Sequence, residues 1–202
     1  MHPLNTVKGA ITTGVVLAIV VSIWLTAWAD MGISFHWGRL DRWAHIVAGV
    51  TWIGLLYYFN VVQTPGLAAA AADSGGPGGA GISKYIAPRA LLWFRWSALV
   101  TWVSGAIYLL GGFGSASVIV LAFSLQSGFR TIGVGAWLGT IMLFNVWVFI
   151  WPNQKKILGV VPATDEEKAA ARKIAGRASR INFILSLPML MCMGASSHGL
   201  PF

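Results

Sequence analysis

The chain has 202 residues, of which 56% are hydrophobic and only 10% are charged. Soluble globular domains carry about a quarter of their residues as charged side chains, so this composition excludes a water-soluble domain. At roughly 20 apolar residues for each bilayer crossing, the length accommodates five or six spanning helices and no separate soluble domain. The net charge of +8 is therefore interpreted as a determinant of membrane topology, and no nucleic-acid partner is expected.

The predicted fold is an all-α, polytopic bundle of transmembrane helices that forms one integral membrane domain over residues 1–202. Spanning helices are long, apolar and bounded by charged or turn residues. The apolar segment 117–127 is too short to cross and is predicted to be interfacial or re-entrant, with a sixth crossing as the alternative. The five predicted spans cover residues 7–29, 40–62, 90–110, 131–151 and 181–197.

The distribution of basic residues predicts the orientation of the bundle. Loops on the cytoplasmic side of a membrane carry an excess of Lys and Arg. With five crossings, ten of the 14 basic residues fall on the side of the N-terminus. We therefore expect a cytoplasmic N-terminus, an outer C-terminus and a multi-pass location in a bacterial inner (cytoplasmic) membrane.

Two connections between the predicted spans differ in composition. Residues 66–82 are small, rich in Gly and nearly uncharged, which predicts a flexible loop. Residues 164–180 instead begin with Thr164 as a helix N-cap, continue with three acidic residues and end in basic residues, an order that suits a helix dipole. We expect a short amphipathic helix on the cytoplasmic face, either near anionic headgroups or simply solvated.

Three of the four histidines, His36, His45 and His198, fall on the predicted outer side and form the candidate metal-binding set. His45 is the strongest of them, since an ionisable residue inside a spanning helix usually faces the bundle interior. We expect haem b, with His45 as one axial ligand and His198 as the first choice for the second. Covalent c-type haem is excluded because Cys192 is the single cysteine and no Cys-x-x-Cys-His motif is present.

Helical spacing places Asp41, Arg42, His45, Gly49 and Trp52 along one stripe. Gly49 leaves space where a flat ring could approach the imidazole. Asp41 is predicted to accept the second ring N–H and so to fix the tautomer, as carboxylates do for metal-bound histidine. We assign Asp41, His45, Gly49 and Trp52 to cofactor binding. The alternative is a neutral histidine that bonds to a neighbouring helix.

A second polar set lies toward the predicted cytoplasmic half. Arg95 either presents a planar donor fork to an anionic ligand or extends to the membrane interface. Asn145 is either functional or a hydrogen-bonding contact between helices. Together with Arg42, these two residues form the candidate catalytic set. Met189 and Met193 share one helix face and are predicted to pack, with thioether ligation as the alternative.

Four segments carry longer motifs: residues 42–60, 84–96, 135–140 and 145–156. The first segment reads RWAHIVAGVTWIGLLYYFN and the last reads NVWVFIWPNQKK. These motifs resemble the membrane domain of the bacterial membrane-bound urate oxidase (urate hydroxylase) family, over about residues 36–199.

The resemblance implies oxidation of urate to 5-hydroxyisourate, with electrons leaving through a fused c-type cytochrome domain. The present sequence ends at Phe202 without that domain, so we expect a separate c-type cytochrome or a larger membrane complex as partner. The predicted function is oxidation of urate or a similar planar substrate at a haem or metal site, with Arg42 or Arg95 binding the anion. The alternatives are a haem-carrying subunit and a non-catalytic structural subunit.

Overall fold

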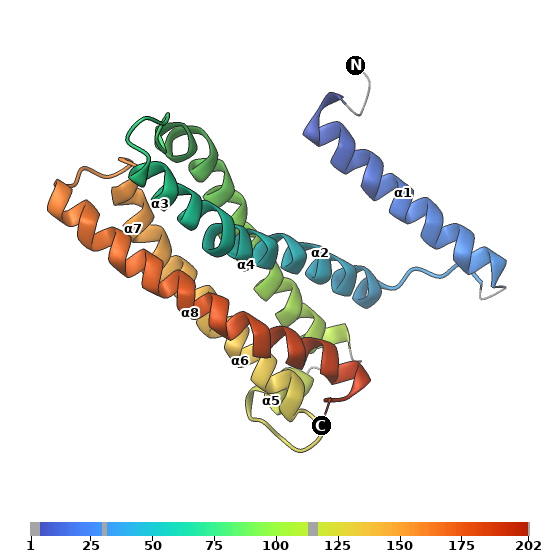
Figure 1. Ribbon diagram of the computed structural model, residues 1–202. Coiled ribbons are helices and arrows are strands. Elements are labelled where there is room, and N and C mark those ends of the chain that lie inside the picture. Colours follow the sequence, from blue (N-terminus) through green and yellow to red (C-terminus); the bar gives the residue numbers. More distant parts are fainter. Residues whose placement is uncertain (1–4, 30–31, 113–116, 202) are drawn as a thin grey trace. The chain divides into compact units, whose positions relative to one another are not determined.

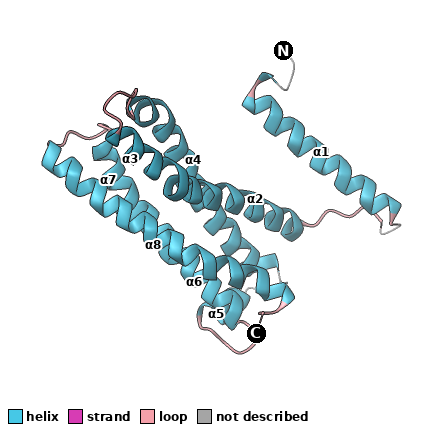
Figure 2. Cartoon of the chain, in the orientation of Figure 1, coloured by secondary structure: helices cyan, strands magenta, loops and turns pink. Residues whose placement is uncertain are grey.

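The computed structural model describes residues 5–29, 32–112 and 117–201, and within these ranges it contains helices and loops but no strand (Figures 1 and 2). Five helical runs among these residues are long and apolar enough to cross a membrane. The prediction of an all-α, multi-pass membrane protein with five spans is therefore confirmed. The runs are Val7–Trp28, Trp37–Ala72, Ile82–Gly111, Arg130–Ile157 and Asp165–His198.

The chain divides into two compact units, Met1–His36 and Trp37–Phe202, which are described separately. The first unit contains α1 (Val7–Trp28). The Thr6 side chain caps this helix by accepting a hydrogen bond from the backbone N–H of Gly9 at 3.0 Å. Apolar side chains cover the whole circumference of α1, as in a helix that crosses a membrane.

The second unit is a bundle of long helices, several of which include a π-helical segment (Figure 1). Such segments insert an extra residue into a helical turn and occur frequently at functional sites. In chain order the elements are α2 (Trp37–Tyr57), η2 (Tyr58–Gln63), α3 (Thr64–Ala72), η3 (Ile82–Ile86), α4 (Ala87–Ile107), η4 (Tyr108–Gly112), α5 (Ser117–Phe123), α6 (Arg130–Phe144), η5 (Asn145–Ile150), α7 (Trp151–Ile157) and α8 (Asp165–His198).

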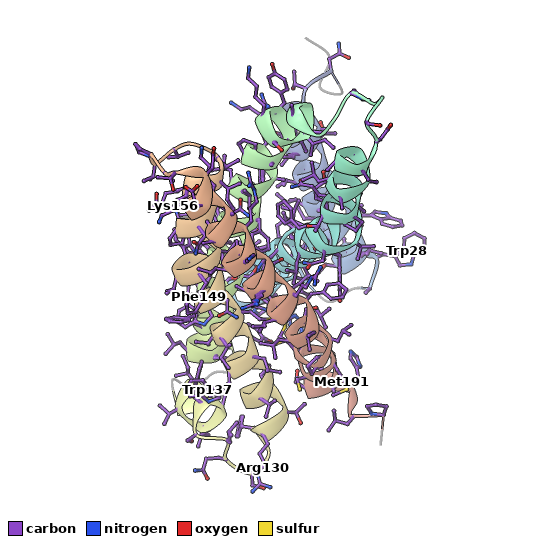
Figure 3. The ribbon with its side chains drawn as sticks, turned by 60° about the vertical axis from the view of Figure 1, so that its left-hand side comes forward. Trp28, Arg130, Trp137, Phe149, Lys156 and Met191 are labelled. Carbon is purple, nitrogen blue, oxygen red and sulfur yellow. The ribbon has the colours of Figure 1, made fainter. Side chains whose placement is uncertain are left out.

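The core of the second unit lies where α2 packs on α4 and α6 packs on α8. Trp52, Leu56, Phe94, Met142 and Val146 are its largest fully buried apolar side chains. α6, η5 and α7 form one run of 28 residues, which at 1.5 Å per residue is about 40 Å long. Arg130 and Lys156 accordingly lie at opposite ends of this unit in Figure 3.

The Gly-rich connection is shorter than the predicted loop over 66–82. Its first residues continue the helix as α3, which ends at Ala72, and the non-helical residues are 73–79. The reason is the run of five alanines at 68–72, since Ala has the highest helix propensity. The non-helical connection is therefore confined to the stretch that contains Gly75, Gly76, Gly78 and Gly79.

The predicted surface helix over 164–180 and the predicted span over 181–197 form one continuous helix, α8. Thr164 is its N-cap as predicted: the Thr164 hydroxyl accepts from the Glu167 N–H at 3.2 Å, and the Glu167 carboxylate accepts from the Thr164 N–H at 2.9 Å. No Gly or Pro between residues 177 and 187 interrupts the helix. Its first half is also not purely a surface helix, because Ala171, Ala175 and Ala178 are buried.

The apolar segment 117–127 adds no further span. Its helical part, α5, has seven residues and packs against α6. A Cβ atom on Gly133 would collide with the carbonyl oxygen of Ala122, so the two backbones approach as closely as glycine permits.

Candidate functional site

A cavity of about 670 Å³ lies within the second unit and is walled by α2, α4, η4, α5, α6 and α8. Its volume is in the range of about 300–1,000 Å³ that is typical of ligand sites. The walls are largely apolar and carry a small number of polar groups, which is also typical of such sites. Polar and titratable side chains in the lining include Arg42, His45, Trp52, Thr101, Trp102, Tyr108, Ser196, Ser197 and His198.

His45 is held by α4 through its ring Nδ1 atom. This atom lies 2.8 Å from the backbone carbonyl oxygen of Thr101 and 3.4 Å from the Ser104 hydroxyl. A carbonyl oxygen can only accept, so Nδ1 carries the proton in this contact, and in the neutral ring Nε2 keeps its lone pair. The arrangement prepares His45 to be a ligand or an acceptor through Nε2.

The space beside the imidazole is provided by Gly105. A Cβ atom at this position would lie 2.9 Å from Cε1 of His45, which is closer than van der Waals contact. The predicted provider of this space was Gly49, but a Cβ atom there would meet only Thr101 Cγ2 at 3.7 Å, an ordinary contact. The close approach thus comes from the neighbouring helix and not from the histidine's own helix.

Asp41 does not take the predicted position against the ring N–H, because the Thr101 carbonyl occupies it. The Oδ2 atom of Asp41 is buried and has no hydrogen-bond partner among the described residues. Asp41 is also not part of the cavity lining. The backbone of α4, rather than a carboxylate of α2, therefore fixes the tautomer.

The cavity brings together several residues that are far apart in the sequence. His45 and His198, separated by 153 positions, both line it, as do Arg42 and Trp52. His36 belongs to the first unit, where its Nε2 atom lies 2.8 Å from the Ser34 hydroxyl. The structure thus unites two members of the predicted metal-binding set.

Arg95 and Asn145 lie outside the cavity lining. The guanidinium carbon of Arg95 is 3.7 Å from the ring centre of Trp151, a cation–π contact between α4 and α7. Asn145 is buried and donates to Asn182 Oδ1 at 2.8 Å, while Asn182 donates to the Met142 carbonyl at 2.9 Å. Both predicted catalytic residues are therefore engaged in contacts between helices.

Comparison with known families gives one match. Residues 113–202 match the family model described as urate oxidase N-terminal. The resemblance to urate oxidase is thereby confirmed for this region. The match indicates a urate-related function. No curated protein and no solved structure matches the chain.

The region that matches the urate oxidase N-terminal model supplies only part of the cavity. It contributes α5, α6 and the C-terminal part of α8, with Met189, Met193 and His198 in the lining. Arg42 and His45 precede the matched region. The cavity is therefore shared between the matched region and the helices before it.

Sequence reasoning missed the α4 residues that hold His45. Ser97, Thr101 and Gly105 follow one another at four-residue spacing, a pattern that indicates close helix packing. The Ser104 hydroxyl was the available signal for a polar contact, since Thr101 contributes only its backbone carbonyl. His45, however, lies 59 positions before Ser104 and 56 before Thr101, and nothing in the sequence joins those positions.

The described residues contain no group of three or more His, Cys, Asp or Glu side chains that could hold a metal ion. The predicted metal set of His36, His45 and His198 stays a prediction, since His36 belongs to the first unit and the other two residues to the second. Haem needs fewer ligands from the protein than a bare metal ion does, since the macrocycle itself supplies four ligands to the iron. The donors that line the cavity for that purpose are His45, His198, Met189 and Met193.

Proposed function

We propose that the protein is a membrane-embedded redox protein that oxidises urate or a similar planar substrate at a haem b site in this cavity. The observation that carries the proposal is the contact between His45 Nδ1 and the Thr101 carbonyl oxygen at 2.8 Å. An imidazole whose N–H is held by a backbone carbonyl presents the other nitrogen as a metal ligand.

The residues of the cavity fit a haem in three respects. Gly105 lets α4 approach the imidazole, so the ring is held from one side without a bulky neighbour. Apolar side chains from several helices would line a macrocycle: Ile46, Leu109, Phe123 and Ile132. His198 would be the first choice for the second protein ligand, with Met193 as the thioether alternative. Bound there, haem supplies a one-electron acceptor inside the membrane.

Arg42 is proposed to bind the substrate anion. It lines the same cavity as His45 and lies three positions before it in α2, and its guanidinium presents a planar fork of donors to an anionic group. The predicted catalytic roles of Arg95 and Asn145 have less support because both side chains have partners elsewhere. In our proposal these two residues stabilise the bundle.

The proposed reaction requires an electron acceptor outside the chain. Conversion of urate to 5-hydroxyisourate consumes one water molecule and releases two electrons and two protons. We propose that the electrons pass to a separate c-type cytochrome or to a larger membrane complex in a bacterial inner membrane. The second candidate function, a haem-carrying subunit without its own substrate, has the same support from His45.

The test is an absorption spectrum of the purified protein in detergent, reduced minus oxidised. The proposal expects Soret and α bands that disappear in His45→Ala and persist in Val50→Ala, a control on the same helix at a position 68% exposed. Absence of both bands from the wild type would reject the haem site. Haem that urate does not reduce would favour the carrier, and isolation without cofactor in fixed stoichiometry with other subunits would favour a structural role.

A further inference from the structure

Arg95 is a cation within a spanning helical run and has no anionic partner. It belongs to α4 and lies inside the run Ile82–Gly111. Among the described residues its guanidinium contacts the ring of Trp151 but forms no hydrogen bond and no ion pair. A cation–π contact leaves the five N–H donors of the guanidinium unused. Because an unpaired charge in a bilayer is costly, these donors indicate an anionic ligand.

The donors of Arg95 are accessible from outside the protein. The residue is only partly buried, and none of its nitrogen atoms is among the fully buried side-chain atoms that lack a partner. Arg95 also lies outside the cavity lining. The ligand that these donors indicate is therefore separate from the substrate that we assign to Arg42.

A second cation lies over the same indole ring. The Nζ atom of Lys155 is 6.0 Å from the ring centre of Trp151. Within the described part of the chain, the Lys155 side chain likewise forms no hydrogen bond and no ion pair. Arg95 and Lys155, here named the cation pair, thus place two positive charges beside one ring, and no described carboxylate neutralises them.

Neighbouring cations differ from the cation pair because they have partners. On α4, the Arg89 guanidinium donates to the backbone carbonyl of Tyr85. On α7, the Lys156 Nζ atom lies 3.8 Å from a carboxylate oxygen of Glu167. The cation pair therefore combines a high local charge with donors that the described protein groups leave free.

The cation pair lies on a seam between α4 and the run that α6, η5 and α7 form. Trp96, the residue after Arg95, has its ring centre 5.6 Å from that of Trp147. Farther along α4, Trp102 donates to the Thr140 hydroxyl at 2.9 Å. The contacts move backward along the second run as they move forward along α4, so the two are antiparallel. The start of α4 and the end of α7 are therefore on the same side of the unit.

The position of the cation pair suits a lipid phosphate group. Arg95 follows Arg89 by six residues, about 9 Å along α4, and helical side chains tilt toward the N-terminus of their helix. The guanidinium therefore reaches back toward the end of the unit that carries Lys156, opposite Arg130 (Figure 3). Lipid phosphates lie just outside the hydrocarbon core, at the interface where Trp side chains are enriched.

An exposed apolar stripe of α4 runs beside Arg95 and suits an acyl chain. Its members recur at spacings of four and seven residues and so share one helix face: Leu92, Trp96, Val103 and Leu110. A free phosphate ion would contact the cation pair but not this stripe, whereas a phospholipid would contact both. The two features together favour a phospholipid that carries a net negative charge.

We infer that Arg95, Trp151 and Lys155 form a binding site for the headgroup of an anionic phospholipid. The guanidinium and the ammonium donate to the phosphate oxygens, and the indole holds the guanidinium in place. One acyl chain lies along the apolar stripe of α4. The inference gives the donor fork of Arg95 a lipid phosphate, rather than the substrate, as its anion, and it depends on neither haem nor urate.

The experiment measures the affinity of the purified protein in detergent for phosphatidylglycerol and for zwitterionic phosphatidylcholine by native mass spectrometry. Wild-type protein is expected to bind phosphatidylglycerol roughly tenfold more tightly. Arg95→Gln is expected to weaken phosphatidylglycerol binding roughly tenfold, the effect of losing charge-assisted hydrogen bonds, and Lys155→Gln about fivefold. Arg89→Gln is the matched control on the same helix and is expected to stay within about twofold of the wild type, since its donor serves the Tyr85 carbonyl.

A second readout separates lipid binding from a purely structural role of Arg95. Phosphatidylglycerol is expected to raise the thermal midpoint of the wild type and of Arg89→Gln, because a ligand of the folded state stabilises it. In Arg95→Gln this lipid-induced shift is expected to be lost, whatever the midpoint of the lipid-free variant. Inorganic phosphate, which has the anionic group without the acyl chains, is expected to leave the wild-type midpoint unchanged.

Three results would overturn the inference. They are equal phosphatidylglycerol affinity in Arg95→Gln and Arg89→Gln, equal wild-type affinity for the two lipids, and a thermal shift from inorganic phosphate as large as that from phosphatidylglycerol. Loss of urate binding in Arg95→Gln, with phosphatidylglycerol binding retained, would also overturn it and restore the catalytic role predicted from the sequence.

Discussion

The Nδ1 atom of His45 and the carbonyl oxygen of Thr101 lie 2.8 Å apart across the interface between α2 and α4. The contact joins a titratable side chain in one spanning helix to the backbone of another, and it leaves a single ring nitrogen with a lone pair. It also makes the histidine depend on how closely α4 approaches.

Gly105→Ala is expected to displace the His45 imidazole, because the added Cβ atom would lie 2.9 Å from Cε1. If His45 binds haem, the haem content of the purified protein falls several-fold. Gly49→Ala is the matched control: its Cβ atom meets Thr101 Cγ2 at 3.7 Å, so haem content is retained. Equal haem content in the two variants would contradict the assignment of Gly105.

Gly133→Ala is expected to destabilise the contact between α5 and α6, where the added Cβ atom would overlap the Ala122 carbonyl oxygen. Overpacking of this kind costs about 1–3 kcal/mol, which thermal unfolding in detergent detects as a lower midpoint. Gly176→Ala serves as the control, since no atom lies within 4 Å of its Cβ position. A Gly133→Ala midpoint at or above that of the control would show that the two helices do not approach as described.

Asn145→Ala is expected to behave as a packing variant and not as a catalytic one. Its amide donates to Asn182 Oδ1 at 2.8 Å, and hydrogen bonds between membrane helices contribute about 0.6 kcal/mol on average and up to about 1.7 kcal/mol. A double-mutant cycle with Asn182→Ala measures this coupling by unfolding. Urate turnover per folded, haem-containing protein should be unchanged. A large loss of turnover without loss of stability would instead restore the catalytic role predicted from the sequence.

Thr164→Ala removes the side-chain half of the capping box at the start of α8. The expected cost is about 1 kcal/mol, observed as faster hydrogen exchange over the first turns of the helix. Thr51→Ala is a suitable control because Thr51 is only partly buried and its hydroxyl donates back to the Val47 carbonyl within its own helix. The same exchange rates for Thr164→Ala and the wild type would contradict a stabilising cap.

The spans were predictable because each is a long apolar run between charged residues. The exact ends of the spans were not predictable. The glycines after residue 74 suggested a loop from residue 66 onward, but the high helix propensity of Ala68–Ala72 continues the helix to Ala72. The continuity of α8 was missed for the opposite reason: a change from charged to apolar composition at Ile181 indicated a boundary, although no helix-breaking residue is present there.

Within the site, the sequence identified His45 and His198 but not what surrounds them. An isolated histidine in a spanning helix is conspicuous because ionisable residues there are costly. Its partner is the main-chain carbonyl of Thr101. Every residue has such a carbonyl, so only the register of α4 against α2 distinguishes Thr101 from its neighbours. Helix periodicity also favoured Asp41, which shares the stripe with His45 but is not the residue that bonds the ring.

The most direct test of the central claim is chemical rescue of His45→Gly by free imidazole, followed by the reduced-minus-oxidised absorption spectrum. If His45 is an axial ligand, the α band is lost in the variant and returns as imidazole is added, because the free ring replaces the missing ligand. Haem bands that are the same in the variant and the wild type, with no response to imidazole, would contradict the claim.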